Sequence, residues 1–221
     1  SARGHQLVTG YLTTTAFIEI ANTLVTKRGG YLSNDIFPPG LFMDNIPEWE
    51  FGVLTLLRDS ARVYRNDFSR SQSQSAEDPD LSLAESKFFF DNNSWMLPAT
   101  ESEYREGIDF FESYRDRLAN PSEANAQFYS RSDNLRQWLA AMETRLGSLS
   151  QRLSASTGKK QLNIDLAGDQ AATRSTNQPG DQIVKTPWLE IDNVFYESRG
   201  FCWALIQFLR AIEADFAAVL D

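Results

Sequence analysis

Apolar residues recur every three or four positions over most of this chain, and this period predicts α-helices. From Thr9 to Arg28 the apolar positions keep the helical spacing, and Gly29 follows as a stop signal. A second helix is expected from Pro47 to Phe68, because proline is favoured in the first helical turn and an apolar stripe follows it. The first third of the chain therefore predicts two amphipathic helices.

A polar connector, residues 69–80 (SRSQSQSAEDPD), separates these helices from two further helical patterns. Leu81–Phe90 predicts a short helix, and a turn rich in Asn and Pro extends from there to Pro98. Thr100 with Glu103 three residues later matches the capping box, in which each side chain binds the backbone N–H of the other residue. A fourth helix is expected to begin here.

The same start signals, Asn120, Pro121 and Glu123, predict a fifth helix. Its apolar stripe is expected to face the core: Leu135, Trp138, Met142, Leu146, Leu149 and Leu153. Residues 156–186 then lack a helical period for longer than the ~15 residues of ordinary loops, which leaves hidden structure, function or partial disorder open. Alternating apolar positions at 162–166 add the alternative of a short strand that pairs with residues 183–184.

The clearest pattern is the last one, where Thr186 as cap and Pro187 as first residue predict a helix. Its apolar positions form a three-four repeat: Trp188, Ile191, Phe195, Cys202, Leu205, Leu209, Ile212, Phe216 and Val219. A parallel row of Val194, Phe201 and Phe208 widens this face, as expected of a central helix with several neighbours. The predicted fold is all-α, an antiparallel bundle of about five to six helices with long ordered crossover loops.

Composition supports a single folded domain over residues 1–221 and narrows its partners. The 221 residues are 42% hydrophobic and 12% aromatic, which is enough to build a core. A total of 30 acidic against 21 basic residues gives a net charge of −9. Because phosphate backbones are bound by clustered Lys and Arg, nucleic acid and anionic membrane surfaces are not expected as partners. Another protein is the expected partner, and the oligomeric state stays open.

Few residues are present that most enzymes use for catalysis. With one cysteine, Cys202, and one histidine, His5, the chain can form neither an internal disulfide nor the usual Cys/His zinc site. The phosphate-binding, nucleophile and metalloprotease motifs are also missing from the sequence. We therefore expect no metal and no cofactor, and we interpret Cys202 as a packing residue.

Carboxylates are the remaining chemical candidates. Four of them lie in or beside the loop of residues 29–50: Asp35, Asp44, Glu48 and Glu50. Two carboxylates at a suitable separation can act as general acid and general base on a sugar substrate. Capping and dipole complementarity before a helix explain Asp44 and Glu48 equally well. The four acids are weak catalytic candidates, and a hydrolase is an alternative to a binding role.

One internal similarity is visible. EIANTLVTKRG (19–29) and EIDNVFYESRG (190–200) share Glu, Ile, Asn, Arg and Gly at the same offsets. A duplicated hairpin is one interpretation, and chance similarity is the other.

Three strings resemble an uncharacterised proteobacterial family, a domain of unknown function: GGYLSNDIFPPG (29–40), DNIPEWEFGVL (44–54) and KTPWLEIDNVFYESRG (185–200). The resemblance implies a helical domain behind a single N-terminal anchor, facing the periplasm from the inner membrane, and it supplies no site residues. The chain lacks an initial Met and ends inside a helical pattern, so we expect a fragment of a longer protein. Its apolar runs are too short to span a bilayer, so membrane attachment is expected only outside this chain.

These observations favour a non-enzymatic, envelope-associated helical domain for protein interaction or scaffolding. The alternative is a carboxylate-based hydrolase that acts on a cell-wall or sugar substrate through the 29–50 loop.

Overall fold

The computed structural model describes residues 8–35, 45–71, 76–120, 122, 125–156, 161–162, 181–182 and 190–220. These residues form α1 (Tyr11–Thr26), α2 (Asn45–Val63), a π-helical turn η2 (Tyr64–Phe68), α3 (Pro79–Phe88), α4 (Thr100–Ala119), α5 (Ser132–Ser156), β1 (Gln161–Leu162), β2 (Asp181–Gln182), α6 (Ile191–Asp215) and α7 (Ala217–Leu220). The all-α bundle predicted from the sequence is confirmed, and the only strands among the described residues are the two-residue pair β1 and β2.

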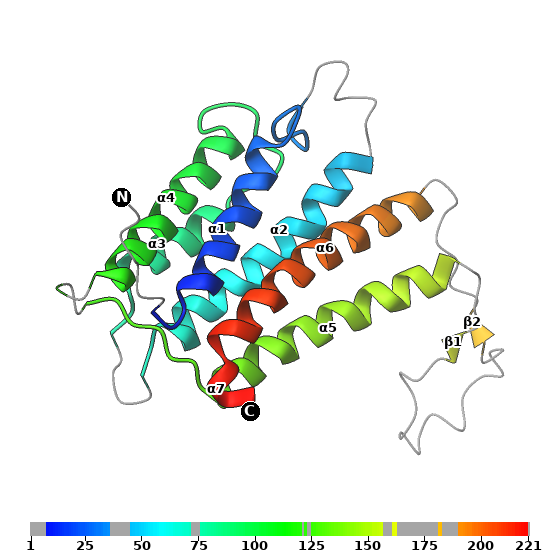
Figure 1. Ribbon diagram of the computed structural model, residues 1–221. Coiled ribbons are helices and arrows are strands. Elements are labelled where there is room, and N and C mark those ends of the chain that lie inside the picture. Colours follow the sequence, from blue (N-terminus) through cyan, green and yellow to red (C-terminus); the bar gives the residue numbers. More distant parts are fainter. Residues whose placement is uncertain are drawn as a thin grey trace, which may run out of the picture.

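The helices α2 and α6 lie side by side in the middle of the bundle, with α1, α3 and α4 on one side and α5 on the other (Figure 1). Trp49 in the second turn of α2 meets Gly200 in the first half of α6, and Phe68, just beyond the end of α2, meets Phe216, just beyond the end of α6. The two central helices therefore run parallel to each other. In contrast, Thr13 at the start of α1 contacts Asp215 at the end of α6, so α1 runs antiparallel to both.

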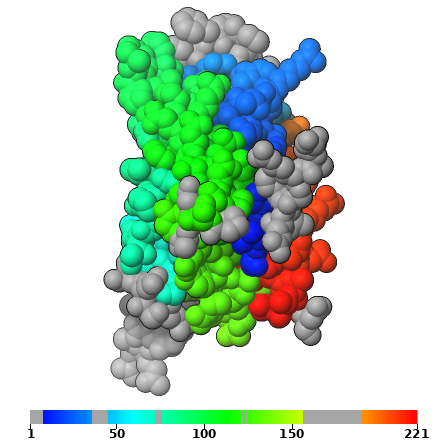
Figure 2. All heavy atoms as spheres, turned by 60° about the vertical axis from the view of Figure 1, so that its left-hand side comes forward, coloured from blue at the N-terminus to red at the C-terminus, as the bar shows by residue number. Residues whose placement is uncertain are grey.

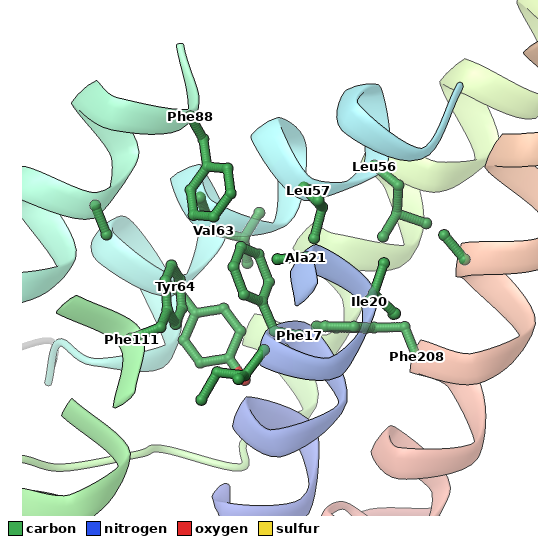
Figure 3. Close-up of a cluster of buried hydrophobic side chains, with 14 of the residues drawn as sticks. Phe17, Ile20, Ala21, Leu56, Leu57, Val63, Tyr64, Phe88, Phe111 and Phe208 are labelled. Carbon is green, nitrogen blue, oxygen red and sulfur yellow. The ribbon is translucent and has the colours of Figure 1, made fainter. Parts of the chain in front are cut away.

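The largest fully buried side chains of the core are all aromatic, and Figure 3 shows several of these rings gathered around Phe17 of α1. The Phe17 ring stacks on Phe111 of α4 at a centroid distance of 3.8 Å and meets Phe88 edge-on at 5.3 Å. Tyr64 lies against the same cluster, and its hydroxyl contacts Thr14 Oγ1 at 3.2 Å. Burial raises the pKa of Tyr64 well above its ordinary value, so the phenol stays protonated. Such ring pairs each add about 0.5–1.5 kcal/mol beyond area burial.

Two glycines set the spacing of α2 and α6. A Cβ on Gly52 would lie 2.0 Å from the carbonyl oxygen of Glu197, and a Cβ on Gly200 would lie 2.1 Å from that of Trp49. Real Cβ atoms do not approach a backbone so closely, so neither position accepts a side chain without moving the helices apart. Gly147 of α5 differs, because no neighbouring atom lies within 4 Å of the place that its Cβ would take.

The predicted start of the fifth helix is wrong: α5 begins at Ser132, and residues 125–131 form a loop. Phe128 in this loop packs against Tyr64 and Phe68, and the N–H of Tyr129 donates to the carbonyl of Phe68 at 2.7 Å. These contacts hold the segment in a non-helical path, so tertiary packing overrides the local start signal. Pro121 and Glu123 lie outside the described residues.

The capping box at Thr100 is also wrong, although α4 begins there as predicted. The Thr100 hydroxyl donates to the carbonyls of Asp91 and Ser94 at 2.8 and 2.9 Å. Glu103 instead accepts from Lys87 of α3 at 2.8 Å. The threonine thus holds the preceding turn closed, while the glutamate joins two helices.

The buried face of α6 is the row of Val194, Phe201 and Phe208 together with Leu205 and Ile212. Three positions of the predicted three-four repeat are exposed instead, Phe195 by 54%, Leu209 by 38% and Val219 by 36%. The reason is the close approach of α2 at Gly200, which turns the Phe201 side of α6 inward. Leu146 of α5, also predicted to be buried, is 38% exposed. Thr186, Pro187 and Trp188 lie outside the described residues.

The remaining loop predictions have mixed outcomes. In the long segment 156–186, β1 pairs with β2 antiparallel, Gln161 opposite Gln182, while residues 163–180 and 183–184 lie outside the described residues. The connector 69–80 ends earlier than predicted, because Asp78 caps α3 through the N–H groups of Asp80 and Leu81. The duplicated hairpin is wrong: Gly29 follows the end of α1 with φ 98°, whereas Gly200 lies inside α6.

Candidate functional site

Glu50 is the innermost of the candidate carboxylates that the structure describes, with 0% of its residue surface exposed. It accepts hydrogen bonds from the N–H groups of Leu32 and Ser33 at 2.8 and 2.7 Å, and from the Ser33 hydroxyl. Lys27 forms an ion pair with Oε1, the oxygen that also accepts from Leu32, and the same ammonium donates to the carbonyls of Leu24 and Gly30. Glu50 and Lys27 therefore tie the loop after α1 to the second turn of α2.

This arrangement gives Glu50 a structural role. A carboxylate has about four lone-pair positions, and four donors from the loop and Lys27 approach this one. A buried charge is tolerated only when it is paired and hydrogen-bonded in this way. The geometry leaves no open side of the carboxylate for a substrate.

Of the other three candidates, the structure describes Asp35 and Glu48. Asp35 is exposed at the end of the loop, and Asp44 lies outside the described residues. Glu48, in the first turn of α2, is half-buried and lines an open hollow of about 270 Å³ together with Ser33, Pro47, Phe51, Asn92 and Asn93. Among the described candidates, the structure brings only Glu48 into this hollow.

The loop between α3 and α4, residues 89–99, lies next to the loop after α1 and arches over the N-terminal end of α4 (Figure 1). The Tyr31 hydroxyl donates to the carbonyl of Asn92 at 3.1 Å, and the Asn34 amide donates to that of Ser94 at 3.0 Å. Desolvation raises the pKa of Tyr31 and also raises the pKa of Tyr104 to about 12, so both phenols remain donors at neutral pH. Figure 2 shows the blue atoms that follow α1 beside the green atoms of α4 at this end of the molecule.

The same loop displays three consecutive apolar side chains, which we call the Trp95–Leu97 tip. Trp95 is 52% exposed, Met96 is 59% exposed and Leu97 is 98% exposed. Behind them, the Ser94 hydroxyl donates to the carbonyls of Met96 and Pro98. The sequence predicted only a turn here, and the signal that could have pointed to this loop is an apolar triplet inside an Asn-rich and Pro-containing turn.

A second hollow, which we call the arginine cleft, has a volume of about 290 Å³ and lies between α2, α5 and α6. Its lining is Phe51, Gly52, Thr55, Arg145, Ser148, Leu149, Arg152, Glu197 and Phe201. Arg145 binds Asp59 of α2 through two hydrogen bonds of 2.6 and 3.1 Å, and these raise the pKa of its guanidinium. Arg152 forms an ion pair with Glu197 of α6. The periodicity of apolar residues does not reveal this site, and the sequence signal that could have pointed to it is two arginines two turns apart on one helix.

The described residues hold no group of three His, Cys, Asp or Glu side chains arranged to bind a metal ion. In the same part of the chain, no helix combines the length and the apolar character needed to cross a membrane. Cys202 is half-buried, and desolvation raises the pKa of its thiol.

Comparison with known proteins places the chain in one family. The family model described as "Uncharacterized protein conserved in bacteria (DUF2333)" matches residues 1–221, so the chain belongs to this uncharacterised bacterial family. No curated protein and no solved structure gives a significant match.

Proposed function

We propose that this chain is a non-enzymatic protein-interaction domain that binds its partner through the Trp95–Leu97 tip. We further propose that it works in the bacterial envelope, tethered to the inner membrane by a segment outside this chain and facing the periplasm. The location rests on the resemblance of the 29–40, 44–54 and 185–200 strings. The binding role rests on one observation, a firmly held loop that exposes three apolar side chains.

The contacts behind the tip support a docking role. Thr100, Asn34 and Tyr31 all bind backbone carbonyls of the loop, so its shape exists before any partner arrives. A preformed loop loses little conformational entropy on binding. Tryptophan and methionine are also enriched at the centre of protein interfaces, where a few such side chains supply most of the affinity.

The surrounding charge favours a protein over a lipid surface. Asp91 is exposed at the base of the tip, Glu101 lies at the start of α4, and the whole chain carries a net charge of −9. These acids repel an anionic bilayer, whose attraction for proteins depends on Lys and Arg. A partner with an apolar pocket and a basic rim matches both features.

The hydrolase alternative has weaker support. Glu50 is enclosed by its loop donors, and Glu48 is the only described candidate that lines a hollow. General acid–base catalysis needs two groups within reach of the same bond.

Site-specific photo-crosslinking in the bacterium of origin tests the proposal. A photoreactive amino acid replaces Met96 in the full-length protein, and the matched control carries it at Leu83, which is 49% exposed on α3. We expect a discrete crosslinked protein from position 96 that is lost when Trp95→Ala and Leu97→Ser are added. Identical products from both positions, or products that the two substitutions leave unchanged, would overturn the docking role.

A further inference from the structure

The arginine cleft presents positive charge outward on an acidic protein. In the Arg145–Asp59 pair the arginine side chain is 49% exposed and the carboxylate 9%, and in the Arg152–Glu197 pair the values are 44% and 10%. In both pairs the carboxylate therefore lies behind the guanidinium. Both arginines and one of the two acids, Glu197, line the cleft, and the guanidinium groups are the more exposed members of the two pairs, although the net charge of the chain is −9.

The guanidinium groups keep donors for a ligand. Arg145 binds Asp59 through Nε and Nη2, which uses two of the five N–H donors that an arginine carries. The buried carboxylate also holds the guanidinium plane in place, so less side-chain entropy is lost when a ligand binds. Planar guanidinium groups match the oxygens of a carboxylate or a phosphate.

The lining combines apolar and polar groups. Phe51 from α2, Leu149 from α5 and Phe201 from α6 supply the large apolar side chains, and Thr55 and Ser148 add hydroxyls. Arg145 and Arg152 are seven residues apart on α5, which at 1.5 Å per residue corresponds to roughly 10 Å along the helix. A charged head at one arginine would thus lie in the same cleft as these apolar side chains.

The size of the cleft limits the ligand. A volume of about 290 Å³ is at the lower end of small-molecule sites. At roughly 30 Å³ for each water-sized group, it accommodates about ten non-hydrogen atoms. We propose that the arginine cleft binds a small amphiphilic oxyanion, a carboxylate or phosphate head on a short apolar chain. This site lies apart from the Trp95–Leu97 tip and does not depend on the proposed partner.

Calorimetric titration of the purified chain with four probes tests the inference. Octanoate and pentyl phosphate carry the head and the chain, octanol lacks the charge, and acetate lacks the chain. We expect saturable binding of octanoate or pentyl phosphate with a Kd below about 1 mM, and at least about tenfold weaker binding of octanol and acetate. The tighter of the two anions identifies the head group.

Matched variants locate the binding. Ser148→Trp fills the cleft while both ion pairs remain, and Ser150→Trp places the same side chain on α5 at an exposed position that does not line the cleft. We expect Ser148→Trp to weaken anion binding at least about tenfold and Ser150→Trp to leave it unchanged. Absence of saturable binding by both anions up to about 10 mM, equal binding of octanol, or equal effects of the two variants would overturn the inference.

Discussion

The central helix α6 contacts α2 and α5 in opposite ways. Against α2, Gly52 and Gly200 bring two backbones together so closely that no side chain fits between them. Against α5, Trp138 stacks on Phe208 at 5.2 Å near one end, and Arg152 reaches Glu197 near the other. The first contact is filled by backbone, whereas the second is bridged by long side chains.

This difference explains where the molecule has room for a ligand. Glycines at a helix crossing remove the volume in which a cavity would form, and the dispersion contacts of the two backbones are maximal. Arginines that reach across a gap hold helices together at their tips, so space remains beside their stems. The arginine cleft therefore lies between α5 and the closely packed pair of α2 and α6, and this pair acts as its rigid support.

The largest loss of stability is expected where Gly52 of α2 and Gly200 of α6 bring the two helices together. Gly200→Ala or Gly52→Ala places a methyl group about 2 Å from a backbone carbonyl oxygen of the facing helix. Overpacking against a backbone that cannot yield should destabilise the fold by about 3 kcal/mol or more. Urea denaturation followed by circular dichroism measures this loss. A change of less than about 1 kcal/mol would mean that the helices separate easily and that the crossing is not rigid.

A smaller effect is expected from the apolar face of α6, where two leucines four residues apart differ in burial. Leu205 is 7% exposed and Leu209 is 38% exposed. Leu205→Ala should destabilise the chain by about 2 kcal/mol, because it leaves a cavity, and Leu209→Ala by less than about 1 kcal/mol. Paired thermal and urea melts measure both losses. Equal losses would place the exposed edge of α6 in an interface, and a reversed order would contradict the assigned buried face.

The ion pairs of α5 should contribute still less to the free energy of unfolding. Arg145→Gln removes a bidentate pair whose arginine is half exposed, so solvent screening limits the expected loss to about 1 kcal/mol. Salt near 1 M should reduce the difference between this variant and the original chain. Arg136→Gln on the exposed part of the same helix is the control. A loss several times larger for Arg145→Gln would show that Asp59, left without its partner, dominates the stability of α5.

The smallest effect, of opposite sign, is expected at Gly147. No atom lies within 4 Å of the position that a Cβ would take, and the residue is inside α5. Gly147→Ala should therefore stabilise the chain by about 0.5–1 kcal/mol through helix propensity alone. The melting temperatures of Gly147→Ala and Gly200→Ala, measured side by side, separate the gain in helix propensity from the cost of packing a methyl group against a backbone. A destabilising Gly147→Ala would indicate that α5 needs flexibility at this point.

The existence of the helices could be predicted from the spacing of apolar residues. The Trp95–Leu97 tip and the arginine cleft could not be predicted in this way. The stripes of α1, α2 and α6 contain enough apolar positions to reveal the helices without knowledge of their neighbours. Periodicity does not state which neighbour is closest, so Phe195 and Leu209 were placed on the buried face of α6. It also does not reveal that Glu50 is enclosed by the loop that follows α1, because these groups are 17 or more residues apart.

The start of α5 also could not be predicted from local sequence signals. Asn120 and the residues after it carry the local signals of a helix start, yet the contact of Phe128 with Tyr64 and Phe68 keeps the segment outside α5. A local signal is worth about 1 kcal/mol, and burial of an aromatic ring outweighs it.

The sequence by itself determined that this chain forms an all-α core rich in aromatic residues, with an acidic surface and few catalytic groups. Helical spacing and composition are local or additive properties, so they can be read without coordinates. Only the tertiary structure decided that Gly52 and Gly200 form the closest crossing, that Glu50 holds a loop, and that Trp95 to Leu97 face solvent. The same holds for Arg145 and Arg152 at the cleft, because each of these features depends on residues that lie far apart in the chain and meet only in the folded bundle.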